Sequence, residues 1–492
     1  MRRPLFLTLA LGAVLALVLS ACGSSSSSAP ANPLQTTLSY FPSQTPFVLT
    51  VATKPSAQAA SEEQQLQARL PVLGLGRAAL ISRLAQLGVN YNQDLKPLAG
   101  NPVAIGDPNP SIQAFRNEFL IVWMAKDASK LNALLKKLGG LTAAGSHDGA
   151  KLYRASSAAL AVTGATILFS KSMADVTAAL DRHEHGGGLT SSQYSNAVSG
   201  LPQDAAIHIF GDLTAALSTP QAAKARRVPW VAALRSYGAT LGYSSSGLTI
   251  QFRLDTGGRT LTPSQVPLAT GSTPANVVSG LPVQVGLVNP SQIFSFIEGA
   301  EQATSPLSYA KFLKQQAVVR RRTGIDINTL IAQFQGDLVI DSDTHTTLGR
   351  AGLRDPASVT KVLAKLASAK GGLGTGPSLQ SLGGGLYTFQ PPGRRVLFTV
   401  SANQLVFGFA AAGRQMQAST LRSFAAAPSA PLPGASGALS FRISLSQLLS
   451  LTAGAQTATP LARQILGLLG DFSGSVAATP SALTGKATLA IK

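Results

Sequence analysis

One short pattern occurs twice in the chain and decides its architecture. Residues 88–95 read GVNYNQDL, and a glycine follows at position 100, twelve residues after the first. Residues 324–330 read GIDINTL, and Gly336 again follows twelve residues after the first glycine. In each copy an apolar stretch typical of a strand comes directly after the closing glycine. We therefore interpret the two segments as equivalent points in two copies of one fold.

The match continues beyond these segments. An acidic residue, Asp127 or Asp355, precedes apolar residues spaced by three and four, which predicts a helix with one apolar face in each copy. Lys137 and Lys365 occupy the same position in the two predicted helices. Hairpin-like strands and a strand-to-helix unit follow in the same order, the first hairpin spanning 159–170. We therefore predict an α+β fold of two tandem homologous domains, each a mixed or antiparallel sheet packed with helices.

The two copies also give the expected domain boundaries. We place the first α+β repeat at residues 34–255 and the second at 278–492. Residues 256–277, which are rich in Thr, Pro, Ser and Gly near their start, form the expected linker. A chain of 492 residues is long enough for two domains of this size.

A secretion signal precedes the repeats. The run 5–19 is apolar, and as a helix it would span about 22 Å, which is short of the ~30 Å hydrocarbon core of a bilayer. It ends in Leu19-Ser20-Ala21-Cys22, which resembles the lipobox of bacterial lipoproteins. The resemblance implies cleavage before Cys22, a diacylglycerol thioether on its sulfur, and an acyl chain such as palmitate on its amino group.

This resemblance sets the expected location of the protein. We expect residues 1–21 to be a lipoprotein signal peptide and residues 22–33 to be the lipid anchor with a Ser/Pro/Ala tether. Durable anchoring needs more than one acyl chain, and the lipobox implies two or three. The expected location is extracytoplasmic, with Cys22 anchoring the chain to the cell membrane.

The composition excludes several classes of protein, and the net charge indicates which kinds of partner to consider. Charged residues make up only 12% of the chain, which excludes a disordered or coiled-coil protein, and one cysteine excludes a disulfide scaffold or an iron–sulfur cluster. The net charge is +19, and in an intracellular protein so high a positive charge would suggest a nucleic-acid partner. The lipobox argues against such a partner, because it implies that the chain lies outside the cytoplasm. An anionic lipid or a wall polymer is the alternative partner, although a generally Arg-rich composition also explains the charge. The residues that we assign to an anionic surface are Arg226, Arg227, Arg320, Arg321, Arg322, Arg394 and Arg395.

Two segments contain residue types that bind metal ions. His183 and His185 flank Glu184, and a His-x-His pair can bind zinc or copper when further ligands are supplied. Asp341, Asp343 and His345 resemble part of a metal loop that lacks the Gly and distal Glu of a calcium loop. A helix carboxyl end explains the first segment and a hairpin turn explains the second. We therefore assign no metal ion and no cofactor, and retain these five residues as candidates only.

We expect no enzymatic activity. The chain contains neither a Gly-x-Ser-x-Gly nor a His-Glu-x-x-His motif, and its one cysteine is the expected anchor. Residues 74–79 read GLGRAA and fit a dinucleotide-binding fingerprint only superficially, because no strand clearly precedes them.

The Phe41-Pro42 start before the apolar stretch 47–51, the two glycine-led segments and the tandem layout resemble domain-of-unknown-function family 3352. This family comprises large envelope proteins common in actinobacteria, and the resemblance implies no activity and no catalytic residues. Two functions remain open. The protein binds an apolar, amphiphilic or anionic envelope ligand, or it is a non-catalytic scaffold that contacts another protein or a wall polymer through its basic second half.

Overall fold

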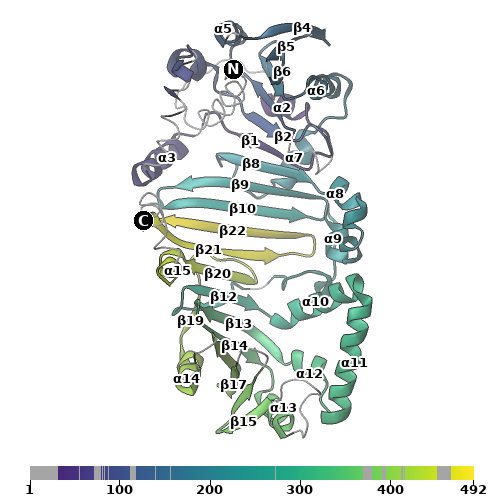
Figure 1. The fold of residues 1–492 in the computed structure, drawn as a ribbon, viewed down its shortest axis with the longest axis vertical. Coiled ribbons are helices and arrows are strands. Elements are labelled where there is room, and N and C mark those ends of the chain that lie inside the picture. Colours follow the sequence, from purple (N-terminus) through teal and green to yellow (C-terminus); the bar gives the residue numbers. More distant parts are fainter. Residues whose placement is uncertain are drawn as a thin grey trace. The chain divides into compact units, whose positions relative to one another are not determined.

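Short antiparallel strands and the helices that cover them build the chain. The computed structural model describes residues 32–451 and 467–492, except 55, 71–78, 80, 83, 87, 111–117, 139, 156, 272, 369–378, 391–394, 412, 413 and 415. The chain divides into two units, many of whose elements are labelled in Figure 1. Unit 1 comprises the chain to Ala222, Leu234–Gly257 and Ile491–Lys492, and unit 2 comprises Ala223–Ala233 and Gly258–Ala490.

The strands of unit 1 form one antiparallel sheet. Their order is β4-β5-β6-β7-β3-β2-β1-β8-β9-β10. The bounds are β1 Val48–Val51, β2 Val103–Gly106, β3 Leu120–Met124, β4 Thr142–His147, β5 Ala150–Ala155, β6 Ala158–Thr163, β7 Thr166–Ser170, β8 Ile207–Asp212, β9 Ser236–Ser244 and β10 Gly247–Asp255.

Helices cover both faces of this sheet. Because neighbouring residues of a strand point to opposite faces, Ala104 and Val122 pack in the core beneath α6, whereas Val103 and Trp123 pack in the core beneath α5. The bounds of the helices are α2 Pro33–Leu38, α3 Ala57–Arg69, η1 Tyr91–Leu95, η2 Lys96–Leu98, α5 Ala128–Leu138, α6 Met173–His185, α7 Ser191–Ala197, α8 Thr214–Ser218 and η4 Pro220–Ala222.

The principal sheet of unit 2 is also antiparallel. Its strand pairings give the order β15-β16-β17-β18-β14-β13-β12-β20-β21, and β11 pairs separately with β19. The strand bounds are β11 Asn276–Val278, β12 Val283–Val288, β13 Phe334–Ser342, β14 Thr346–Leu353, β15 Leu379–Gly383, β16 Leu386–Phe389, β17 Val396–Ser401, β18 Gln404–Ala410, β19 Ser429–Pro431, β20 Leu439–Ser444, β21 Leu469–Ala478 and β22 Ala482–Ile491.

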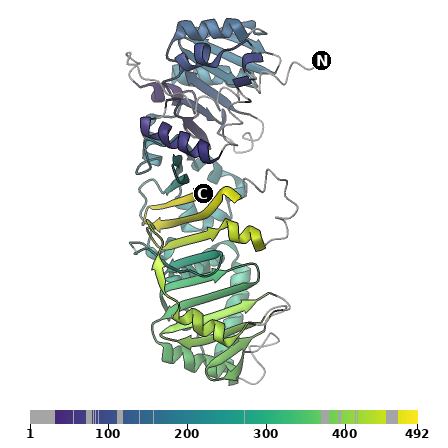
Figure 2. The ribbon, with the colours of Figure 1, turned by 90° about the vertical axis from the view of Figure 1, so that its left-hand side faces the viewer.

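Helices again cover both faces in unit 2. Leu397 and Val406 pack in the core with α14, which crosses the strands in Figure 2, whereas Phe398 and Leu405 pack in the core with α13. The helix bounds are η5 Ala225–Arg227, α9 Pro229–Ala233, η6 Pro263–Gln265, α10 Pro290–Thr304, α11 Pro306–Thr323, α12 Ile327–Ile331, α13 Pro356–Ser368, α14 Ala418–Ala426 and α15 Leu445–Leu451.

The strand order of unit 2 repeats that of unit 1. In unit 1 β3 pairs with β7 and β8 pairs with β1, and in unit 2 the corresponding pairs are β14 with β18 and β20 with β12.

The predicted α+β class with antiparallel sheets is confirmed. The predicted boundaries of the repeats and of the linker stay predictions. The predicted signal peptide and the lipid-attachment residue Cys22 lie outside the described residues. Among the residues described, no helix combines the length and the apolar character needed to cross a membrane.

Candidate anion-binding pocket

A pocket of about 320 Å³ opens in unit 2 where the end of α11, α12 and α13 meet. Its wall combines apolar, polar and charged side chains, so that a ligand with both an anionic and an apolar part suits it. The lining residues are Gly324, Ile325, Asp326, Thr329, Leu330, Gln333, Ser358, Lys361, Val362 and Lys365.

The glycine-led segment 324–330 forms one side of the pocket. Gly324 ends α11 in the left-handed conformation, with φ of 65°, and its N–H donates to the carbonyl oxygen of Arg320. Two residues later Asp326 caps α12, because its Oδ1 accepts a hydrogen bond from the backbone N–H of Asn328 at 2.9 Å. The repeated pattern of the sequence is therefore a helix end followed at once by a helix start.

Helix α13 forms the other side. Asp355 caps its first turn by accepting from the N–H of Ser358 at 2.9 Å, and Val359 and Leu363 fix the helix in the core. Lys361 and Lys365 are four residues apart and share one face of the helix, which lies at the pocket. Both lysines therefore contribute positive charge to the same small volume.

The two units differ at this place in the partner of one matched lysine. In unit 1, Nζ of Lys137 lies 2.5 Å from Oδ1 of Asp94, and this hydrogen bond is the main reason that the pKa of Asp94 is lowered. Lys365 matches Lys137, since each lies ten residues after the capping aspartate of its helix. The position of Asp94, six residues after the first glycine, is occupied by Leu330 in unit 2.

Lys365 consequently lacks the partner that its counterpart has. Among the residues that the structure describes, neither the Lys365 nor the Lys361 ammonium group has a hydrogen bond or an ion pair. Asp326, which also lines the pocket, has its Oδ2 3.8 Å from Nη1 of Arg320, an exposed side chain. The described part of the lining therefore contains two lysines and one aspartate, and this aspartate also faces an arginine outside the lining.

The predicted basic residues lie in several places. Arg320, Arg321 and Arg322 form the exposed last turn of α11, and Arg320 reaches the edge of the pocket through Asp326. The other predicted residues that the structure describes do not line the pocket. Arg226 and Arg227 are exposed in η5, Arg395 donates from Nε to Oγ1 of Thr388 at 3.2 Å, and Arg394 lies outside the described residues.

The predicted His183 and His185 do not face a common ion. Residues two apart on a helix point about 200° away from each other, so the two imidazoles leave α6 on opposite sides. His183 is half-buried, stacks on Tyr40 with ring centroids 4.2 Å apart, and has Nδ1 2.6 Å from Oγ of Ser39; burial lowers its pKa. His185 is exposed at the end of the helix.

Asp341, Asp343 and His345 belong to the hairpin between β13 and β14. Asp341 is buried, accepts from the N–H of Leu281, and has a pKa raised by burial to about 6. Asp343 accepts from the backbone N–H of His345 at 2.7 Å and so holds the turn. Within the described residues these side chains form no group of three metal ligands.

Two arrangements are not predicted from the sequence. The pattern matches Lys137 with Lys365 without indicating a role for either, and the replacement of Asp94 by Leu330 is the signal that points to the pocket. The potential metal ligands His147, Asp148 and Asp181 are not evident from the sequence, because these residues come from two separate elements.

Comparisons with known proteins give a family but no activity. A model of the family described as "Protein of unknown function (DUF3352)" matches residues 5–342. Three solved structures, crystal forms III, I and IV of TP0453, are similar at 10%, 9% and 12% identity with TM-scores of 0.27, 0.26 and 0.27. The matched regions cover 46%, 46% and 44% of this chain and 81%, 81% and 79% of those chains. This similarity is too distant to bear on function. No curated protein matches the chain.

Proposed function

The chain belongs to the DUF3352 family of proteins of unknown function, and within it we propose the role of a lipid-anchored envelope protein that binds the phosphate group of an anionic envelope molecule. The pocket of unit 2 is the proposed binding site. The proposal involves binding alone, with no covalent change to the ligand.

One observation carries the proposal, namely that Lys365 lines a pocket without the acid that neutralises its counterpart Lys137. A lysine ammonium without an internal partner gains most from an external anion, and its hydrogen bonds to a charged acceptor are stronger than those to a neutral one. Lys361 lies one turn away and adds a second donor to the same anion.

The size and wall of the pocket favour a head group over a whole lipid. Its volume of about 320 Å³ is at the lower end of the range for small-molecule sites. Ile325, Leu330 and Val362 supply apolar contacts beside the lysines, which suit the carbon atoms of a phosphate ester. A phospholipid head group and a phosphate of a wall polymer share this chemistry.

The test is a calorimetric titration of the full chain, in neutral detergent at low salt, with glycerol phosphate. We expect the double variant Lys361→Ala/Lys365→Ala to bind at least about tenfold more weakly than the wild type. Lys311→Ala/Lys314→Ala removes the same charge from exposed positions of α11 and should bind as the wild type does. Equal loss in both variants would instead indicate general charge attraction.

Two further titrations distinguish the ligand sources. Short-chain phosphatidylglycerol represents the lipid, and a short poly(glycerol phosphate) represents the wall polymer. The source that binds more tightly than free glycerol phosphate, and loses that advantage in Lys361→Ala/Lys365→Ala, is the physiological class. If neither exceeds glycerol, which carries no phosphate, the proposed function is wrong.

The lipid anchor is tested separately. Cys22→Ala removes the sulfur to which the diacylglycerol would attach, so we expect loss of the acyl masses in intact-protein mass spectrometry and a shift from the detergent to the aqueous phase on partitioning. An unchanged mass and partition would remove the anchor from the proposal and leave the pocket untouched.

The helical hairpin α10–α11 favours the scaffold as a second function. Its exposed side chains include Phe294, Ile297, Leu307, Phe312 and Leu313, which are 40–82% exposed. The same hairpin carries Lys311, Lys314 and the Arg320–Arg322 turn, so a partner with apolar and acidic groups suits it. A photo-crosslinking residue in place of Leu307 tests this in cells, because a crosslinked protein supports a scaffold and the absence of any protein adduct counts against it.

A further inference from the structure

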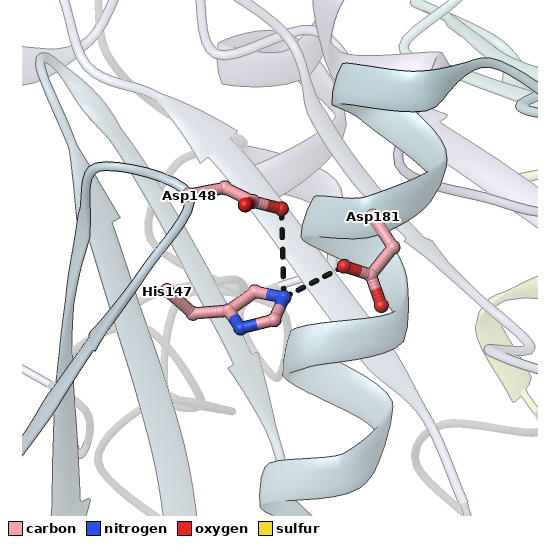
Figure 3. Close-up of side chains that lie close together, drawn as sticks. All are labelled: His147, Asp148 and Asp181. Carbon is pink, nitrogen blue, oxygen red and sulfur yellow. Dashed lines mark hydrogen bonds and ion pairs between the residues drawn. The ribbon is translucent and has the colours of Figure 1, made fainter.

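A second site, in unit 1, is independent of the pocket. The hairpin between β4 and β5 turns at Asp148 and Gly149, which both have left-handed backbones, with φ of 46° and 73°. Asp-Gly is a preferred pair for such a two-residue turn. The turn places His147 and Asp148 beside the last turns of α6, from which Asp181 projects, as Figure 3 shows.

The three side chains converge on one point. Nε2 of His147 lies 2.6 Å from Oδ1 of Asp181 and 3.5 Å from Oδ2 of Asp148, and in Figure 3 both carboxylates approach this same ring nitrogen. One ligand atom from each residue lies within 4.8 Å of the other two. We propose that His147, Asp148 and Asp181 bind one divalent transition-metal ion and that this ion joins the β4–β5 hairpin to α6.

The distances suit such an ion with small movements. Zinc binds imidazole nitrogen and carboxylate oxygen at about 2.0–2.2 Å, so two ligand atoms of a tetrahedral ion are about 3.3 Å apart. The observed separations of 2.6 and 3.5 Å lie on either side of this value. The three side chains are between 30% and 53% exposed, so each can rotate without disturbing the core.

The ligand set selects the class of metal. An imidazole with two carboxylates suits zinc and its neighbours, whereas calcium and magnesium prefer sites built from oxygen alone. Three protein ligands leave a coordination position for water, which reaches the site because the strand β4 is exposed along most of its length. When the ion binds, the proton that His147 shares with Asp181 leaves Nε2, since a metal-bound imidazole nitrogen carries none.

Unit 2 provides an internal comparison. Its equivalent hairpin, between β15 and β16, has Gly383 as the last residue of the first strand and turns at Gly384 and Gly385, and α14 at the place of α6 contains neither His, Asp nor Glu. The repeated fold therefore does not require the three residues. The presence of His147, Asp148 and Asp181 in unit 1 alone is consistent with a binding site that only one of the two copies acquired.

The experiment measures Zn²⁺ binding to the full chain by competition with a chromophoric zinc chelator. We expect one ion per chain in the wild type and an affinity at least about tenfold lower in His147→Ala and in Asp181→Asn. His345→Ala is the matched control, since His345 also lies in a hairpin turn beside an aspartate, Asp343, and it should bind as the wild type does. Circular dichroism of each variant shows that it is folded.

Each outcome decides the proposal. Loss of the ion in His147→Ala and Asp181→Asn together with retention in His345→Ala supports it. A wild type that binds no Zn²⁺, or a His147→Ala variant that binds it equally well, overturns it. Calcium that displaces Zn²⁺ at equal concentration would overturn the assignment to a transition metal.

Discussion

The Nζ atom of Lys365 lies 3.0 Å from the position that a β-carbon would take at Gly324. The ammonium group therefore sits over a glycine at the pocket, where any larger residue would crowd it. Its counterpart Lys137 is drawn to Asp94 instead, at 2.5 Å. The two matched lysines thus have different surroundings in the two units. Unit 2 lacks the acid that pairs with Lys137, and this explains the difference.

Restoring that acid should close the anion site. Leu330→Asp places a carboxylate where unit 1 has Asp94, so we expect Lys365 to pair internally and glycerol phosphate to bind at least about tenfold more weakly. Leu330 also packs at the edge of the core, and Leu330→Asn loses the same packing without adding charge. Calorimetry should therefore show a much smaller loss for Leu330→Asn, and equal losses would argue against charge as the cause.

The ion pair of unit 1 should contribute little to stability, and only above acidic pH. Lys137 is 49% exposed, so Asp94→Asn should lower the free energy of unfolding at pH 7 by about 0.5 kcal/mol. Because the pKa of Asp94 is lowered in the folded state, its contribution is present above about pH 4 and is lost as the pH falls through the folded pKa. Denaturant titrations at pH 7 and pH 2.5 should show a smaller difference between variant and wild type at pH 2.5 than at pH 7.

A buried cation should stabilise unit 2 strongly. Arg350 is 5% exposed, and its Nη1 donates to the carbonyl oxygens of Phe424, Ala425 and Ala427 at 3.0, 3.0 and 2.7 Å, at the carboxyl end of α14. Arg350→Ala removes the guanidinium donor from all three carbonyls, of which Phe424 keeps the backbone N–H of Ala427, so we expect a loss of about 3 kcal/mol in denaturant unfolding. The exposed Arg354 is the control, and Arg354→Ala should change stability by less than about 0.5 kcal/mol.

A buried carboxyl should make unit 1 more stable in mild acid. Asp107 is fully buried, and burial, with the nearby Glu118 and Asp175 carboxylates, raises its pKa to about 6, although the N–H of Asn109 opposes the shift. The folded state holds this proton more tightly than the unfolded state, so stability falls as the pH rises from about 4 to about 6.

Asp107→Asn removes this dependence. At pH 7 we expect the variant to be about 2 kcal/mol more stable than the wild type, with a difference that vanishes toward pH 4. Thermal and denaturant unfolding across this range measure it, and the exposed Asp204→Asn serves as the control. A constant difference at all pH values would show that Asp107 does not titrate there.

Local patterns of the sequence predicted local elements well. The apolar spacing after Asp127 and Asp355 predicted α5 and α13, and the stretch 159–170 is the β6–β7 hairpin with its turn at Gly164. These signals succeed because helix faces and hairpins depend on residues close together in the chain. The return of β8 to β1 depends on burial of a whole sheet, and no local pattern in the sequence indicates it.

The sites were harder to predict for the same reason. His183 and His185 are neighbours in the sequence, whereas the helix places Asp181, not His183, next to the β4–β5 turn. The pocket forms only where α11, α12 and α13 pack together, and the sequence alone does not show that Lys361 lines it. The residue types alone therefore indicated that the surface is basic, but not which basic residues line a binding site.

In each unit the first strand of the principal sheet pairs with a strand that comes much later in the chain, which has a consequence for folding. Val48 pairs with Phe210, and Val283 pairs with Ile443, so about 160 residues separate the partners in each unit. As the chain emerges, β1 and β12 can gain one neighbour early, but their second edge stays open until β8 and β20 arrive. During that interval the exposed edges can pair with other chains, and we expect aggregation during refolding to depend on protein concentration.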